Sequence, residues 1–566
     1  MSAPAASGQS TSTDDLDRAV DDLREHARTF ARLSPRAKAR LVRSCLPGTV
    51  AVAAAWSARG LEAKGLPSTS AEEWLTGPLP TVRHLRLLAD SLDAVAAVGR
   101  PALGTAARIR ADGRLEVDLF PATGFDRALY RGISAYALFP DGVDAAAAHE
   151  AQAPFYAERG PEGGVCLVLG AGNASSIPAM DVLTKMFNEG QVCLLKINPV
   201  NEWVGPLLEQ ALAPLIVPGF LRIVYGGADV GRHLVEHTGI DAVHLTGSAQ
   251  THDALVWGPP GPEQDRRRAA NEPLLQIPIT SELGNVTPVI VVPHRYPHAD
   301  LVFQARYLAT MVANNASCNC ISAKMVVTAN GWPQREEFLN LVASFLAGIP
   351  NRKAYYPGAA QRYATLTEGR SVQPIGACAA GQLPWGIIRG LDAADRDEPL
   401  FTTEPFCSLL SETSVGSTDP VEFLATATGF VNDTLWGTLS AAIVIPGELE
   451  RDRSVAAALD RAITDLRYGN VAVNHWPALN YALVSLPWGG HPSATLTDIQ
   501  SGAGWVHNSY MLQGFEKVVL RGPVQSRPTP PWFADHPTAG RAGADLVAFE
   551  ADPGWSKLPR LLRHLL

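Results

Sequence analysis

The spacing of the hydrophobic residues changes along this chain and divides it into regions of different structure. Between residues 14 and 100, apolar residues recur at helical spacing with charged residues between them, as in "DDLDRAVDDLREHARTFARL". From about residue 163, short and wholly apolar runs alternate with helical segments, and from residue 282 to about 499 a second alternation of this kind follows. The pattern predicts an α/β protein whose first segment is helical.

The first alternation has the features of a doubly wound parallel sheet. The runs "VCLVLG", "VCLLKIN", "LRIVYGG" and "AVHLTGS" are typical of buried parallel strands, and each is separated from the next by a helical segment. Such sheets bind ligands at the carboxyl ends of their strands. Glycines and polar residues gather at those ends: Gly170, Gly172, Lys196, Gly226, Gly227, Gly247 and Ser248.

The remaining segments differ in composition from these two units. "RIRADGRLEVDLF" predicts a hairpin with its turn at Asp112–Gly113. Residues 256–279 interrupt the alternation with prolines and an arginine triplet, which indicates a surface insertion. Residues 1–13 predict a disordered tail, and residues 523–566 a Pro-rich, irregular C-terminal extension that ends in a short amphipathic helix.

Composition and charge exclude several classes of partner. The net charge of −9 leaves no basic surface to neutralise phosphates, so we expect neither a nucleic acid nor an anionic membrane as partner. No continuous apolar run approaches the roughly 20 residues of a membrane helix, and the N-terminus lacks the features of a signal peptide. The seven cysteines are sparse and odd in number, as in a protein with free thiols. We expect a cytoplasmic protein.

The stretch "NNASCNCISAK" carries the strongest candidate for chemistry, because it places Cys318 and Cys320 two residues apart. A structural zinc site needs about four ligands in spaced pairs, and no matching pair accompanies these two cysteines, so we expect no metal. A buried, inert pair remains open on the local sequence alone. A nucleophile is the third reading.

Two other residues favour the nucleophile. Glu282 lies at the end of one predicted segment, and Asn173 lies at a turn between a strand and a helix. A thiol, a carboxylate and an amide donor together suffice for acyl chemistry at sulfur, because the amide holds an oxyanion and the carboxylate activates water.

The motifs of residues 130–522, in their order along the chain, resemble those of the aldehyde dehydrogenase superfamily. The stretches that carry the resemblance are "GAGN" at Asn173, Lys196 in "KINP", "HLTGS", "SELGNVTP", "NASCNCISA", "TEPF" and "PWGGHPS". Each motif is degenerate, but the ordered set is specific. When Asn315 is aligned with the family's asparagine, the nucleophile falls five residues later, at Cys320. Cys318 then occupies a position that a glutamine holds in the family.

The resemblance implies a fold, a site and a cofactor. It implies a Rossmann-type cofactor domain, formed by residues 14–132 and 162–281, and an α/β catalytic domain at 282–499. A small β oligomerisation element, residues 133–161 and 500–522, would build a homodimer or homotetramer. The catalytic residues would be Cys320, Glu282 and Asn173, and NAD or NADP would bind the following residues: Gly172, Lys196, Asn198, Gly227, Gly247, Ser248, Glu404 and Phe406.

Departures from the family pattern bear on the cofactor. Members that prefer NAD carry a glutamate three residues after the lysine, whereas this chain carries Pro199. Without that carboxylate nothing repels a 2′-phosphate, which makes NADP a plausible cofactor. The arginine triplet Arg266–Arg268 either assists there or is simply a solvated surface.

Three functions, two catalytic and one non-catalytic, are compatible with this set of residues. The first is oxidation of an aldehyde to a carboxylic acid through a cysteine thioester. The second is reduction of an acyl thioester, as in an acyl-CoA reductase of the same superfamily. The third is a catalytically silent relative that acts as a scaffold. Glu282 favours the first, because a carboxylate base is needed to hydrolyse the thioester.

Overall fold

A computed structural model describes residues 10–102 and 107–565 of the chain. Residues 1–9 of the predicted disordered tail lie outside these ranges. For residues 10–13 the prediction is wrong, because the Thr11 N–H donates to the Tyr225 carbonyl and the Thr11 hydroxyl accepts from the Tyr225 N–H, both at 3.0 Å. Ser12 then caps the first helix, which begins at Thr13.

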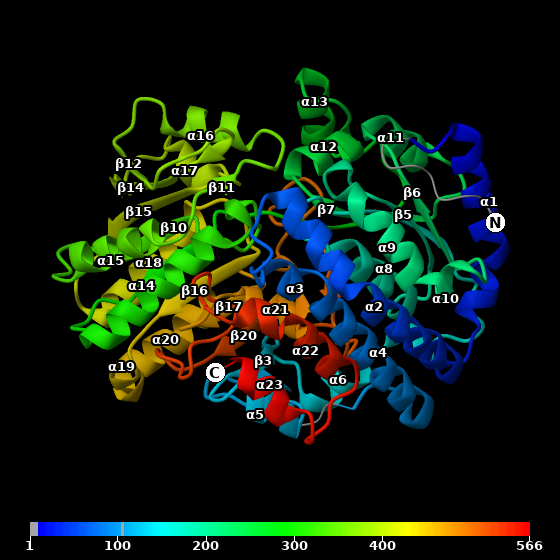
Figure 1. Cartoon of the computed structure of the whole chain (residues 1–566), viewed down its shortest axis with the longest axis horizontal. Helices are drawn as coiled ribbons and strands as arrows, with labels where there is room; N and C mark the ends of the chain where they lie inside the picture. Colours follow the sequence, from blue (N-terminus) through cyan, green and yellow to red (C-terminus); the bar gives the residue numbers. More distant parts are fainter. Residues whose placement is uncertain (1–9, 103–106, 566) are drawn as a thin grey trace.

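The predicted N-terminal helices are present: α1 lies at the right edge of Figure 1, α3 lies near the centre of the view, and α2 and α4 run from the centre toward the lower right. By length and composition α2 could cross a membrane, with a mean hydropathy of 1.2, although charges interrupt its apolar run. In this fold it packs against α4, α9 and α22. Serines cap α1 and α2, and α2 ends at Gly65 in the left-handed conformation. The helices are α1 (Thr13–Ala31), α2 (Pro35–Lys64), α3 (Glu72–Thr76) and α4 (Pro78–Val98).

The first alternation folds as a five-stranded parallel sheet in the order β6-β5-β4-β7-β8, as its pattern predicts. Its strands are β4 (Val165–Leu169), β5 (Val192–Lys196), β6 (Leu221–Val224), β7 (Ala242–Gly247) and β8 (Ile279–Leu283). The helical segments that connect them are α8 (Ile177–Phe187), η1 (Pro199–Val204), α9 (Gly205–Ala211), α10 (Ala213–Ile216), α11 (Ala228–Glu236), α12 (Ala249–Trp257) and α13 (Pro262–Ala270). This unit occupies the right half of Figure 1.

The second unit is an eleven-stranded sheet in the left half of Figure 1. Seven neighbouring strands are parallel, and antiparallel strands extend the sheet at both ends. In spatial order the strands are β1 (Ala107–Ile109), β2 (Leu115–Phe120), β3 (Ser134–Leu138), β20 (Lys517–Arg521), β17 (Asn470–Val473), β16 (Ser440–Val444), β9 (Pro288–Val291), β10 (Met325–Ala329), β15 (Leu409–Val415), β14 (Trp385–Leu391) and β12 (Val372–Ile375).

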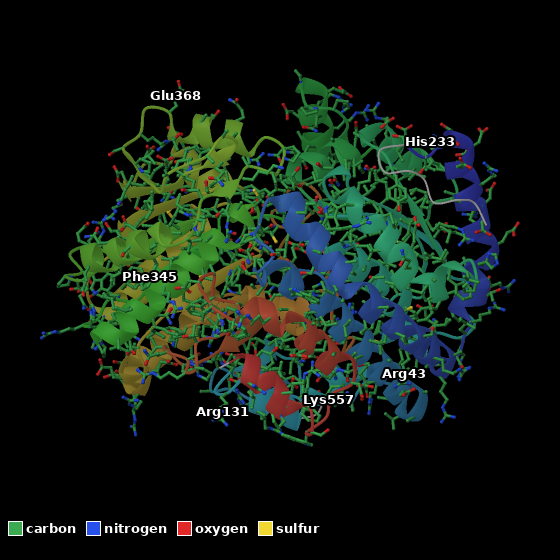
Figure 2. The ribbon with its side chains drawn as sticks, in the orientation of Figure 1. Arg43, Arg131, His233, Phe345, Glu368 and Lys557 are labelled. Carbon is green, nitrogen blue, oxygen red and sulfur yellow. The ribbon has the colours of Figure 1, made fainter. Side chains whose placement is uncertain are left out.

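Helices and two short antiparallel strand pairs complete this half. The longer helices are α14 (His298–Ala313), α15 (Arg335–Ala347), α18 (Pro420–Asp433) and α20 (Arg453–Asp465). Shorter elements are η2 (Asn314–Ser317), α16 (Ala359–Thr367), α17 (Pro399–Thr402), α19 (Gly447–Arg451) and α21 (Ala478–Leu483), with the pairs β11 (Arg352–Lys353) and β13 (Gln382–Leu383), and β18 (Pro487–Trp488) and β19 (Val506–His507). Phe345 and Glu368 mark this half in Figure 2, and His233 of α11 marks the other.

Strands β1, β2, β3 and β20 correct two predicted boundaries. The hairpin of β1 and β2 lies in the range 14–132, which was assigned to the cofactor domain, yet it belongs to the eleven-stranded sheet. The segments 133–161 and 500–522 contribute β3 and β20, and β20 pairs with β3 on one side and with β17 on the other. The predicted oligomerisation strands therefore complete a sheet within their own chain. Along the chain, the segment from β2 to β4 contains three further helices: α5 (Gly124–Leu129), α6 (Ala145–Glu150) and α7 (Pro154–Ala157).

The C-terminal extension is irregular as far as residue 538 but then forms two helices, α22 (Ala539–Ala551) and α23 (Leu558–Leu565), of which only the second was predicted. Its first part packs on α14, where Phe533 stacks on Tyr307 with ring centroids 4.8 Å apart. Its second part packs on α2, α3 and α4, where the buried Glu550 pairs with Arg83 and Arg86. Both helices lie at the front of Figure 1, and Lys557 in Figure 2 marks the segment between them.

Candidate active site

A cavity of about 1700 Å³ lies where the carboxyl ends of the five-stranded sheet face the second unit. Its wall includes the side chain or backbone of every residue that the sequence assigned to catalysis or cofactor binding. The three candidate catalytic residues, Asn173, Glu282 and Cys320, line this cavity together with Glu404 and Phe406. The remaining candidates that line the cavity are Gly172, Lys196, Asn198, Gly227, Gly247 and Ser248.

The nucleophile loop follows α14 and has an unusual backbone. Asn315, Ala316 and Ser317 have φ angles of 54°, 55° and 60°, a left-handed run that residues other than glycine seldom adopt. Hydrogen bonds hold this run from several sides. Ser317 Oγ donates to the Val312 carbonyl at 2.7 Å, and Lys324 Nζ donates to the Ser317 carbonyl at 2.6 Å.

The two cysteines of this loop have different surroundings. Cys320 lines the cavity, and its thiol donates to Glu282 Oε1 at 3.5 Å. Cys318 is 1% exposed and does not line the cavity, and its thiol donates to the Phe406 carbonyl at 3.4 Å. The sulfur that can reach a ligand in the cavity is therefore that of Cys320.

Glu282 ends β8 and is buried beside this thiol. Burial, with the negative charge of Asp181, raises the pKa of Glu282 to about 8, and its Oε2 has no hydrogen-bond partner among the described residues. Burial and the charges of Glu282 and Glu404 also raise the pKa of the Cys320 thiol well above its usual range. The thiol is consequently protonated at neutral pH, and Glu282 is the adjacent group that can receive its proton.

The cavity wall in the five-stranded unit is suited to a phosphate-bearing ligand. Gly227 precedes α11, and Ser248 is the N-cap of α12, so the amino ends of two helices border the cavity. Lys196 adds a positive charge at the end of β5. At Gly172 a Cβ atom would lie 2.7 Å from Asn198 Oδ1, so the loop approaches this side chain only because residue 172 is glycine.

The opposite wall contains an acceptor without a partner. Glu404 Oε1 is buried and makes no hydrogen bond to any described residue, and a Cβ at Gly284 would collide with this carboxylate. Burial raises the pKa of Glu404 to about 7. Phe406, with a φ angle of 44°, packs edge-on against Tyr356 at 4.8 Å. A free acceptor beside an aromatic ring fits the ribose and nicotinamide that the resemblance assigns to these two residues.

Sequence reasoning missed several residues of this site. Arg362 donates to the carbonyls of Pro405 and Phe406, and thereby fixes the backbone that carries the aromatic ring. Lys324 is buried within the nucleophile loop, and a lone lysine before an apolar strand was the available signal. Among the described residues, no group of three or more histidine, cysteine or acidic side chains is arranged to hold a metal.

The segment 256–279 is more than a surface insertion. Gly258, Pro259, Pro260 and residues 274–277 line the cavity, whereas no residue of α13, at the top of Figure 1, does so. The arginine triplet is paired within this segment or with α12: Arg266 and Arg267 contact Glu263, and Arg268 contacts Asp253. The solvated-surface reading of the triplet is therefore the better one.

The comparisons with known proteins agree with this fold. Residues 134–359 match the model of the aldehyde dehydrogenase family. Alpha-ketoglutaric semialdehyde dehydrogenase 2 of Azospirillum brasilense is 28% identical over 220 residues, which are 36% of this chain and 39% of that protein. The match thus spans well under half the length of this curated relative.

Solved structures extend the likeness in fold to nine-tenths of the chain. An NADP-dependent glyceraldehyde-3-phosphate dehydrogenase from Bacillus halodurans, complexed with NADP, superimposes with a TM-score of 0.60 at 16% identity and covers 90% of this chain and 92% of its own. The aldehyde dehydrogenase KauB from Pseudomonas aeruginosa superimposes with a TM-score of 0.61 at 16% identity, covering 91% and 90%. At these identities the likeness concerns the fold.

Proposed function

Because this chain is a relative of the aldehyde dehydrogenase superfamily, we propose that it oxidises an aldehyde to a carboxylic acid with NAD or NADP. The observation that carries the proposal is the contact between Cys320 and Glu282 within a cavity whose other end is suited to a dinucleotide. A nucleophile, an adjacent base and a phosphate site in one cavity are the parts that this reaction needs.

The reaction begins with the Cys320 thiol. Glu282 removes its proton, and the sulfur adds to the aldehyde carbon to give a tetrahedral thiohemiacetal. The Asn173 side-chain amide makes no hydrogen bond to the described residues and borders the same cavity, so it is available to hold the new oxyanion. Glu404 and Phe406 would hold a nicotinamide here, and this group would accept the hydride that leaves the carbon, so that Cys320 would be left as a thioester.

Glu282 acts a second time when the thioester is hydrolysed. After releasing its first proton to solvent, Glu282 takes one from a water molecule, and the resulting hydroxide attacks the thioester carbon. The carbon–sulfur bond breaks, the carboxylic acid leaves, and the Cys320 sulfur regains a proton. Loss of Glu282 would therefore slow formation of the acyl-enzyme and block its hydrolysis, so that the acyl-enzyme that does form accumulates, whereas loss of Cys320 would prevent its formation.

We propose further that the enzyme accepts NADP. Lys196 lines the cavity, and Pro199 leaves the adjacent position without a carboxylate. The same arrangement does not forbid NAD. The homodimer or homotetramer and the cytoplasmic location expected from the sequence stay predictions.

The direct test is the absorbance of the reduced cofactor with a panel of aldehydes and with each cofactor in turn. We expect formation of the reduced cofactor and stoichiometric acid, with NADP at least as effective as NAD. A strong preference for NAD would contradict the cofactor proposal alone. Oxidation of the reduced cofactor by an acyl thioester, without any forward oxidation, would instead support an acyl thioester reductase, and no turnover in either direction would support a silent relative.

A further inference from the structure

The left-handed run of the nucleophile loop needs outside support, because its conformation is unfavourable for three successive residues with side chains. The backbone N–H of Asn315, at the start of this run, points away from the cavity into the protein. Its acceptor is Glu72 Oε2 at 2.9 Å, on the short helix α3. The loop is thus attached to a segment almost 250 residues earlier in the chain.

Glu72 is buried and its charge is matched. It is 9% exposed, and its Oε1 accepts from Arg352 Nη2 at 2.8 Å, so the carboxylate bridges a guanidinium and a backbone N–H. Neither Glu72 nor Arg352 lines the cavity. These two residues therefore have no direct access to a substrate or cofactor bound there.

Glu73, the next residue of α3, makes a corresponding attachment to the loop that carries Asn173. Glu73 is 1% exposed, and its Oε1 accepts from Lys64 Nζ at 2.5 Å. The same ammonium group donates to the Asn173 carbonyl at 2.9 Å. Glu73 Oε2 also accepts from Ser175 Oγ at 3.3 Å, two residues beyond Asn173.

The two loops are also joined directly to each other. Asn315 Nδ2 donates to the Asn173 carbonyl at 3.0 Å and to the Cys318 carbonyl at 2.9 Å, and Tyr355 OH donates to Asn315 Oδ1 at 2.9 Å. Two adjacent carboxylates of α3 thus fix two loops whose separation sets the distance between the oxyanion donor and the sulfur.

We propose that Glu72 and Glu73 are positioning residues of the active site, each for one catalytic loop. Glu72, neutralised by Arg352, holds the loop that carries Cys320. Glu73, through Lys64, holds the backbone of Asn173. The assignment of Asn173 and Cys320 to catalysis rests on the proposed function, but the attachment of Glu72 to the nucleophile loop does not.

The two roles predict different effects. If Glu72 holds the nucleophile loop, its loss moves Cys320 away from Glu282 and lowers the pKa of the thiol toward its ordinary value. If Glu73 holds the Asn173 loop, its loss impairs the oxyanion site and leaves the thiol unchanged. Displacements of about 1 Å in such sites reduce turnover by about 100-fold.

The experiment compares Glu72→Gln and Glu73→Gln with Glu412→Gln as a matched control. Glu412 is fully buried on β15 and pairs with Arg335 at 2.6 Å, but it does not line the cavity or contact either loop. For each variant, the pH dependence of Cys320 alkylation by iodoacetamide is measured together with kcat, the KM for cofactor and the temperature of unfolding. Mass spectrometry identifies the alkylated cysteine.

We expect Glu72→Gln to shift the alkylation profile to lower pH and to reduce kcat about 10- to 100-fold at unchanged KM for cofactor. Glu73→Gln should reduce kcat without moving the profile, and Glu412→Gln should change only the unfolding temperature. If Glu72→Gln does not fold, Glu72→Asp keeps the charge opposite Arg352 while drawing the acceptor away from Asn315, and a smaller shift in the same direction is expected.

An alkylation profile identical in all variants would overturn the role of Glu72. An unchanged kcat in Glu73→Gln, in an enzyme that turns over aldehyde, would overturn the role of Glu73. Because alkylation requires no turnover, a shifted profile in a protein without aldehyde activity would uphold the attachment of Glu72 while refuting the proposed function.

Discussion

The two sides of Cys320 differ in how completely their polar groups are paired. On the cavity side, Glu404 Oε1 and Glu282 Oε2 are buried without a partner among the described residues. Away from the cavity, Ser322 Oγ also lacks a partner, but Ser317 and Lys324 hydrogen-bond within the loop, and Trp476 Nε1 donates to the Ile321 carbonyl at 2.6 Å. Since buried polar groups are costly to leave unpaired, the unpaired side is where a ligand is expected and the paired side holds the nucleophile in place.

The two cysteines provide the strongest test of this difference. Cys320→Ser should reduce aldehyde oxidation by at least about 10⁴-fold, because a hydroxyl is a far weaker nucleophile than a thiolate. Cys318→Ser should retain activity within a few-fold, since Cys318 is buried and does not line the cavity. Steady-state formation of the reduced cofactor measures both. An inactive Cys318→Ser beside an active Cys320→Ser would reverse the assignment.

Glu282→Gln should give the next largest effect, about 10²- to 10⁴-fold in steady-state turnover. The amide keeps the shape of the side chain but cannot accept a proton from the thiol or from water. Intact-protein mass spectrometry after mixing with aldehyde and cofactor should show an acyl adduct on any enzyme that has passed the first step. Rapid turnover without an adduct would show that another group is the base.

The pH dependence of turnover should follow Glu282. A general base acts only when it is deprotonated, so with its pKa raised to about 8 the rate should increase with pH up to about 8 and then level off. Well below that value the rate should change about tenfold per pH unit. In the Glu282→Gln variant the rate should no longer rise with pH in this way. If the rise persists in that variant, a group other than Glu282 causes it.

Lys196→Ala should produce the smallest of these effects and should act on cofactor binding. Loss of a charged hydrogen-bond donor is worth about 1.5–3 kcal/mol, or roughly 10- to 100-fold in the dissociation constant. Titration by fluorescence with NAD and with NADP measures it, and Arg266→Ala on the outer surface of α13 is the control. Unaltered binding of both cofactors would remove Lys196 from the site.

The sequence predicted the parts of this site that local motifs define. Lys196 and Ser248 follow short apolar strands at positions where a doubly wound sheet gathers its ligand groups, so the topology alone placed them together. Cys320 was distinguished from Cys318 by its spacing from Asn315, which depends on one loop. These residues could be predicted from the sequence because each position depends on a chain segment of about ten residues.

Contacts between distant segments could not be predicted in the same way. Glu72 and Glu73 are adjacent acidic residues, and nothing near them indicates that Glu72 accepts from the Asn315 N–H or that Glu73 pairs with Lys64. The pairing of β20 with β17 was missed because β20 could equally pair with another chain, and edge strands do not specify their partner by composition. Helix α22 carries Gly540 and Gly543 in its first turns, which weakens its helical signal.

The position of β20 bears on how the chain folds during synthesis. This strand lies between β3 and β17, and its residues pair with β3 residues about 380 positions earlier, so the sheet stays divided until almost the whole chain has left the ribosome. Until then β3 and β17 each present an open edge, and nascent chains can associate through them. A ribosome-stalled chain that ends before residue 517 should consequently be sensitive to protease in β1–β3, while its five-stranded unit is already protected.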